Sequence, residues 1–131
     1  MDAIWIVALV VGGALLVHFV VFHFIWSKAK GGGDRVSEAS KAWEAIKAGA
    51  LVVDVRGANE CASGMLDGAI NIPHTEVEAR LAEFGDDKAR AIVVYCASGK
   101  RSGMARDVLV GAGFTNVING GGYNDMLGAK P

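Results

Sequence analysis

The hydrophobic residues of the chain follow two patterns, which meet near residue 27. From Ala3 to Trp26 no residue carries a formal charge, and a helix of this length is about 36 Å long at about 1.5 Å rise per residue. The hydrocarbon core of a bilayer is about 30 Å thick, and a helix satisfies all its backbone polar groups within one segment. The pattern therefore predicts a transmembrane helix in residues 1–27, with the span at about residues 3–26.

The residues around this segment predict a retained, oriented anchor. A cleavable signal peptide is the alternative, but Met1-Asp2 supplies no basic residue, and residues 27–30 read SKAK, a poor cleavage site. Lys28, Lys30 and Arg35 all follow the span. The positive-inside rule then predicts a single-pass protein of the inner or plasma membrane, with the following residues facing the cytoplasm.

Two histidines, His18 and His23, lie inside the predicted span. Five positions separate them by about 140° around a helix, so they do not share a face and a paired metal site is not expected. A neutral imidazole near the interface or against a partner helix is the simpler interpretation, and a functional intramembrane group is the alternative.

After a glycine-containing linker at residues 28–35, residues 36–131 alternate short apolar runs with helical periodicity. The apolar runs predict strands at 51–55, 69–73, 91–95 and 116–118. Helices are predicted from a Ser37 cap to Gly49 and from a Thr75–Glu78 capping box to Gly85. A third helix is predicted from the polar loop after the 91–95 strand to Gly113. The last of these is expected to turn Met104, Ala105, Val108, Leu109 and Ala112 inward. A glycine-rich turn at 120–122 and a terminal helical turn follow.

This alternation predicts an α/β domain with a central parallel sheet flanked by helices on both faces. Ligands of such sheets bind beyond the carboxyl ends of the strands, where Tyr95-Cys96 lies. A net charge of −1 from 13 basic and 14 acidic residues gives no reason to expect nucleic acid. Two separated cysteines and three separated histidines exclude a disulfide scaffold and a zinc-finger spacing.

The loop at residues 96–102, CASGKRS, carries the candidate chemistry. Cys96 follows a predicted strand and precedes a helix N-terminus, whose free N–H groups and dipole favour an anion. Gly99 allows a tight turn of successive amides, and Lys100 and Arg101 add positive charge. These features favour the thiolate, which is the nucleophilic form. The alternative is an inert cysteine in the core.

Three segments together, 54–73, 95–102 and 119–126, resemble a single-domain rhodanese, a thiosulfate sulfurtransferase module. The resemblance covers nearly all of residues 36–127 and implies a small α/β domain with a parallel sheet. It also implies that Cys96 is the nucleophile and begins a six-residue loop that ends at Arg101. No metal or organic cofactor is implied.

The resemblance implies two half-reactions. The Cys96 thiolate takes the outer sulfur of thiosulfate and releases sulfite, and a thiol or cyanide then removes that sulfur. The implied substrate-binding residues are Ala97, Ser98, Gly99, Lys100, Arg101 and Ser102. A non-turnover module that relays or senses sulfur for a membrane partner is the alternative; retention of the cysteine and the basic loop residues favours the enzyme.

Loop length separates this hypothesis from cysteine-dependent phosphatases and arsenate reductases. Those loops place five residues between cysteine and arginine, enough for a tetrahedral oxyanion. Here only Ala97, Ser98, Gly99 and Lys100 stand between Cys96 and Arg101. The smaller ring fits a sulfur atom better than a phosphate.

Several residues depart from the family pattern or have two interpretations. Cys61, Met65 and Asp67 stand where the family usually has an aromatic residue, histidine and proline, which predicts altered packing. Cys61 is either a small core residue or a resolving thiol for Cys96. Asp54 and Arg56 either support the site or pair structurally, with Glu60 as another partner for Arg56. His74 is expected to be exposed, with a general base as the alternative.

Overall fold

Four parallel strands form the centre of the part of the chain that the computed structural model describes, residues 38–131. Their order in the sheet is β2-β1-β3-β4, and every neighbouring pair is parallel. The strands are β1 (Leu51–Asp54), β2 (Ile70–Asn71), β3 (Ile92–Cys96) and β4 (Val117–Gly122). The predicted parallel sheet is confirmed, and the apolar runs mark the positions of all four strands.

Strand β3 is buried along its whole length and separates two cores. Ile92, Val94 and Cys96 belong to the core on one face of the sheet, whereas Val93 and Tyr95 belong to the core on the other. This is the period-two alternation of a strand covered on both sides. It fixes the face to which Cys96 projects.

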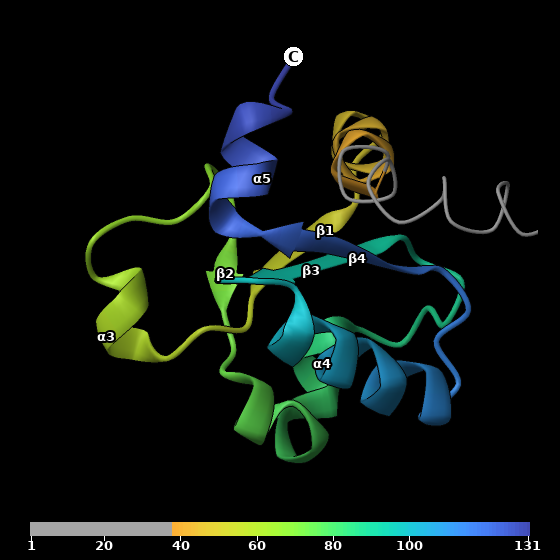
Figure 1. The fold of residues 1–131 in the computed structure, drawn as a ribbon. Helices are drawn as coiled ribbons and strands as arrows, with labels where there is room; N and C mark the ends of the chain where they lie inside the picture. Colours follow the sequence, from red (N-terminus) through yellow and green to blue (C-terminus); the bar gives the residue numbers. More distant parts are fainter. Residues whose placement is uncertain (1–37) are drawn as a thin grey trace, which may run out of the picture. The chain divides into compact units, whose positions relative to one another are not determined.

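Helical segments cover both faces of the sheet (Figure 1). One face is covered by η1 (His74–Glu76), η2 (Glu78–Phe84) and α4 (Lys100–Gly111). The opposite face is covered by a helix at residues 38–47 and by α5 (Tyr123–Gly128). A short helix that the sequence pattern did not predict, α3 (Ala58–Cys61), follows β1.

The helix predicted from Thr75 to Gly85 is wrong in type. The segment forms two 3₁₀ helices, Arg80 interrupts the second with φ −116° and ψ 28°, and no side-chain cap opens either helix. The apolar residues at helical spacing, Val77, Leu81 and Phe84, nevertheless face the core: Val77 and Phe84 are fully buried, and Leu81 packs against the same cluster. The spacing of apolar residues identified the buried face but not the hydrogen-bonding pattern.

Two further predictions need correction. Met104 was expected to face inward on α4, but 52% of it is exposed. It lies about 100° around the helix from Ala105, whose side chain is buried. Strand β4 extends to Gly122 instead of ending at Ile118, so the predicted glycine turn is strand.

The register of β4 against β3 contains a β-bulge. Val94 pairs with Asn119, but Tyr95 pairs with Gly121, so Gly120 has no partner in β3. An extra residue of this kind increases the local twist and redirects side chains.

The predictions for the N-terminal part concern residues outside the described range. They are the transmembrane span at residues 3–26 with His18 and His23, the linker at 28–35, and the Ser37 cap. Within residues 38–131, no helix has the length and apolar character needed to cross a membrane.

Candidate active site

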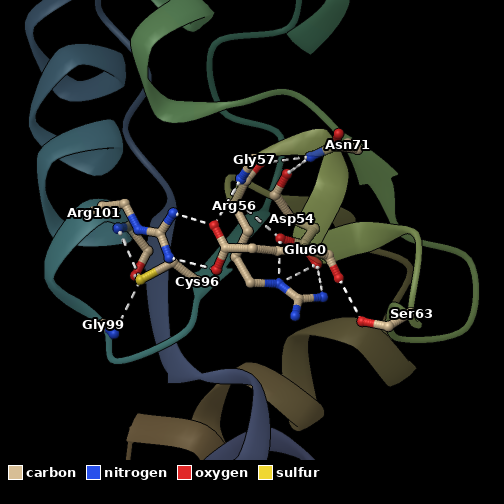
Figure 2. Close-up of polar contacts among 10 residues, drawn as sticks. Asp54, Arg56, Gly57, Glu60, Ser63, Asn71, Cys96, Gly99 and Arg101 are labelled. Carbon is tan, nitrogen blue, oxygen red and sulfur yellow. Dashed lines mark hydrogen bonds and ion pairs between the residues drawn. The ribbon is translucent and has the colours of Figure 1, made fainter.

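Cys96 is the last residue of β3, and the loop after it leads directly into α4. Gly99 precedes the first helical residue, Lys100, and no side chain caps α4 through a hydrogen bond from this position. The parallel sheet thus places the cysteine sulfur at the carboxyl end of a central strand, beneath a helix N-terminus (Figure 2).

Three hydrogen-bond donors converge on the Cys96 Sγ atom. The Gly99 amide donates at 3.0 Å, and the amide and hydroxyl of Ser102 each lie at 3.4 Å. The sulfur therefore takes the place that a side-chain oxygen fills at many helix N-termini. Donors arranged in this way stabilise negative charge on the sulfur.

The surroundings of Cys96 have opposing effects on its pKa. Burial is the largest single effect and raises the pKa, since the residue is 0% exposed. Hydrogen bonds from the Ser102 hydroxyl and from the amides of Ser102, Ser98 and Gly99 together outweigh it, and the pKa is lowered. A more acidic thiol has a larger thiolate fraction at neutral pH.

Glycines let the loop pack tightly against the end of β4. Gly99 has φ +92°, a left-handed conformation that side chains disfavour. A Cβ atom on Gly122 would lie 2.5 Å from the Ala97 carbonyl oxygen. Gly121 and Gly122 therefore lie beside the loop, in a strand instead of the predicted turn.

The Arg101 guanidinium is held by Glu60, which comes from α3. Arg101 Nη1 and Nη2 donate to the two carboxylate oxygens of Glu60 at 2.6 and 2.9 Å (Figure 2). These bonds, followed by that from the Gly57 amide, lower the pKa of Glu60 to about 2. From the sequence alone, Glu60 is expected only as a partner for Arg56. The structure instead places it beside the loop, paired with the predicted substrate-binding arginine.

Asp54 and Arg56 form an ion pair at the end of β1. The pair is buried, and Arg56 Nη2 lies 2.7 Å from Asp54 Oδ2. Burial alone raises the pKa of Asp54, but hydrogen bonds from Arg56 outweigh it and lower the pKa. Arg56 also donates to the Gly64 carbonyl and lies over the Tyr123 ring. These contacts match the structural alternative considered for the pair.

Cys61 and His74 lie apart from the hydrogen bonds around Cys96. Cys61 ends α3, is half-buried, and is a free thiol, as is Cys96. Burial, followed by the nearby Asp54 carboxylate, raises the pKa of Cys61 to about 11. His74 begins η1 and is half-buried instead of exposed. Its amide donates to the Val55 carbonyl.

The remaining predicted loop residues differ in their surroundings. Ala97, Ser98 and Lys100 are exposed, and Ser102 is fully buried. Asn119 of β4 contacts the loop through its side chain and was missed by sequence reasoning. Within residues 38–131, no group of three or more His, Cys, Asp or Glu side chains is placed to hold a metal ion.

Comparison with known proteins gives matches across nearly all of the described residues, 38–131. Residues 38–128 match the family model described as Rhodanese-like domain. The thiosulfate sulfurtransferase PspE of Escherichia coli is 40% identical over 78 residues, which is 60% of this chain and 75% of PspE. The human thiosulfate:glutathione sulfurtransferase is 32% identical over 91 residues, covering 60% of this chain and 79% of its own.

A solved structure shows the same arrangement of elements. The structure described as a rhodanese with anions from E. coli superposes with a TM-score of 0.55 at 40% identity. The match covers 57% of this chain and 88% of that one. The likeness therefore extends to the fold as well as to the sequence.

Proposed function

The chain belongs to the rhodanese-like domain family and is a sulfurtransferase-like enzyme, and we propose that it transfers sulfane sulfur through a persulfide on Cys96. The donor is thiosulfate or a related anion, and the acceptor is a thiol or cyanide. The names of the bacterial and human relatives, which include thiosulfate and glutathione, support these two substrate classes.

The observation that carries the proposal is the set of donors around Cys96 Sγ. The amides of Gly99 and Ser102 and the Ser102 hydroxyl all point at this sulfur. The two backbone amides stabilise the attacking thiolate without having to reorient, and the Ser102 hydroxyl adds a third donor. The α4 dipole acts in the same direction.

The reaction consists of two displacements at sulfur. In the first, the Cys96 thiolate forms a bond to the outer sulfur of thiosulfate. The sulfur–sulfur bond of thiosulfate breaks, and its electron pair leaves with sulfite. In the second, a thiolate or cyanide attacks the outer sulfur of the persulfide, and the electron pair of the broken bond returns to Cys96. No external oxidant or reductant is consumed.

Lys100 and Arg101 provide the positive charge for an anionic donor. Lys100 is exposed at the first position of α4, and Arg101 is part-exposed. Because Glu60 already binds both terminal nitrogens of Arg101, the donor shares or displaces this carboxylate. We therefore assign the first attraction of the donor to Lys100 and the helix N-terminus.

The experiment that tests the proposal is the intact mass of the full-length chain after incubation with thiosulfate. One added sulfur atom is expected, it should map to Cys96, and cyanide should remove it as thiocyanate. Absence of the added sulfur would contradict the persulfide. If Cys96 gains the sulfur but cyanide yields no thiocyanate, the alternative of a non-turnover module that relays or senses sulfur would be favoured.

We extend the proposal to a membrane anchor with the catalytic unit facing the cytoplasm. Its support is the uncharged segment at residues 3–26 and the basic residues Lys28, Lys30 and Arg35 after it. An epitope tag placed after Pro131 tests the orientation. Protease added to intact cells should spare the tag, and cleavage there would reverse the orientation. Recovery of the chain from the soluble fraction would contradict the anchor.

A further inference from the structure

Asn119 of β4 makes three side-chain hydrogen bonds. Its Oδ1 atom accepts from the Ser102 hydroxyl at 2.7 Å and from the Gly121 amide at 3.0 Å, and its Nδ2 atom donates to the Gly99 carbonyl at 3.0 Å. The Gly121 amide can only donate, so the acceptor of this bond must be the Asn119 oxygen. This fixes the orientation of the Asn119 amide group.

Two of these partners are the residues that donate to Cys96. Gly99 and Ser102 supply the three donors at its Sγ atom. We propose that Asn119 is a positioning residue, which holds Gly99 and Ser102 in the orientation that directs their backbone amides at the Cys96 sulfur and keeps the Ser102 hydroxyl within reach of it. This inference rests on the proposed function, in that it names what prepares the same sulfur for transfer.

The Ser102 hydroxyl has one proton and two neighbouring acceptors. Asn119 Oδ1 is 2.7 Å from the hydroxyl oxygen and Cys96 Sγ is 3.4 Å from it, so a single proton serves one acceptor at a time. While Cys96 is a thiol, its S–H donates to the hydroxyl oxygen and the hydroxyl donates to Asn119. When the sulfur is a thiolate, the hydroxyl turns toward it.

Asn119 keeps the free-energy cost of this rotation low. After the hydroxyl turns away, Asn119 Oδ1 keeps the hydrogen bond from the Gly121 amide, so no polar atom is left without a partner. The thiol proton passes to solvent or base, and the hydroxyl proton stays on Ser102. The Nδ2 atom continues to hold the Gly99 carbonyl, so the backbone donors do not move.

The test is the pH dependence of Cys96 alkylation by iodoacetamide in full-length Asn119→Asp and Asn119→Ala variants, with no sulfur donor present. Aspartate keeps the shape but replaces the Nδ2 donor with an oxygen facing the Gly99 carbonyl. Alanine removes the contacts without adding charge. Asn124→Asp is the control, because it adds the same charge at an exposed position of α5.

We expect alkylation at neutral pH to slow about tenfold in both Asn119 variants and to recover at higher pH, since a hydrogen bond to a charged group contributes on this scale. The control should match the unmodified chain. The charged residues near the sulfur, Lys100 and Arg101 on α4 and Glu60 on α3, are unchanged in all variants.

An unchanged pH profile in both variants would overturn the positioning role, even if sulfur transfer were lost. Failure of both variants to fold would also overturn it, because Asn119 would then support the fold and not the loop. Because alkylation needs no sulfur donor, a shifted profile in a chain that never loads sulfur would contradict the proposed function alone.

Discussion

Cys96 and Cys61 are both free thiols, yet the more buried of the two is the better thiolate. Burial raises the pKa of both. Cys96 is fully buried but receives hydrogen bonds from Gly99 and Ser102, so its pKa is lowered. Cys61 is half-buried and lies near the Asp54 carboxylate, so its pKa rises to about 11. The reactivity of a thiol here depends on the donors and charges directed at it more than on its exposure.

The largest expected effect on sulfur transfer comes from replacing the Cys96 sulfur by oxygen, with the same replacement at Cys61 as the comparison. Cys96→Ser should reduce thiocyanate formation from thiosulfate and cyanide to the uncatalysed rate, because the nucleophile is lost. Cys61→Ser is the matched control and should retain most of the rate. A Cys61→Ser variant without activity would show that Cys61 takes part in transfer, as a resolving thiol would.

The Asp54–Arg56 pair beside Cys61 should matter for stability more than for transfer. Asp54→Asn leaves the buried Arg56 charge without its counter-ion, which costs about 3–5 kcal/mol of unfolding free energy. The pKa of Asp54 is lowered in the folded chain. Its contribution is therefore complete above the ordinary carboxyl pKa and is lost as the pH falls through the lower, folded value.

Urea unfolding of the full-length chain over a pH series measures this effect. The difference between Asp54→Asn and the unmodified chain should be large near neutral pH and shrink in acid. Asp67→Asn is the control, because the Asp67 side chain is 98% exposed and 3.6 Å from Lys130. A similar loss in the control would argue against burial as the cause.

A smaller effect is expected from the Ser102 hydroxyl. Ser102→Ala removes one of the three donors to Cys96 and should raise the pKa of Cys96. Sulfur transfer at neutral pH should fall about tenfold and recover as the pH is raised. Ser98→Ala is the control, since the Ser98 side chain is exposed and only its amide acts on Cys96. Steady-state rates over a pH series give both results.

The smallest effect is expected from Glu60, which connects α3 to the loop. Glu60→Gln removes the charge that neutralises Arg101 and should lower the KM for thiosulfate a few-fold with little change in kcat. Glu83→Gln breaks another Arg–Glu pair, with Arg80, on η2 and should leave the KM unchanged. A higher KM in Glu60→Gln would mean that Glu60 orients Arg101 for the donor.

The central features of the fold could be predicted because they depend on local patterns. Apolar runs identified the four strands, and their alternation with helices identified a parallel sheet. The 3₁₀ geometry around Arg80 and the four-residue helix α3 were not predictable in the same way. A kink inside an apolar period and a single helical turn leave no distinct periodicity.

In the candidate site, too, the residues that are adjacent in sequence could be predicted, and those brought in from elsewhere in the chain could not. Cys96 and its loop are contiguous in sequence, so their position between a strand and a helix could be predicted. Glu60 and Asn119 reach the loop from 41 and 17 residues away, bonding to Arg101 and Ser102 respectively. Their roles depend on tertiary approach, which a single sequence does not reveal. A polar residue within a strand beside the cysteine strand was the available signal for Asn119.

The unpaired Gly120 in β4 has a consequence for reading related sequences. Since it is the extra residue of the bulge, the number of glycines between Asn119 and Tyr123 fixes the offset between that asparagine and the α5 helix. In a homologue one glycine shorter the bulge would be lost, and the asparagine and the start of α5 could not both keep their present positions against β3. The number of residues between this asparagine and α5 is thus more informative about whether a homologue can position its cysteine loop than the mere presence of glycines.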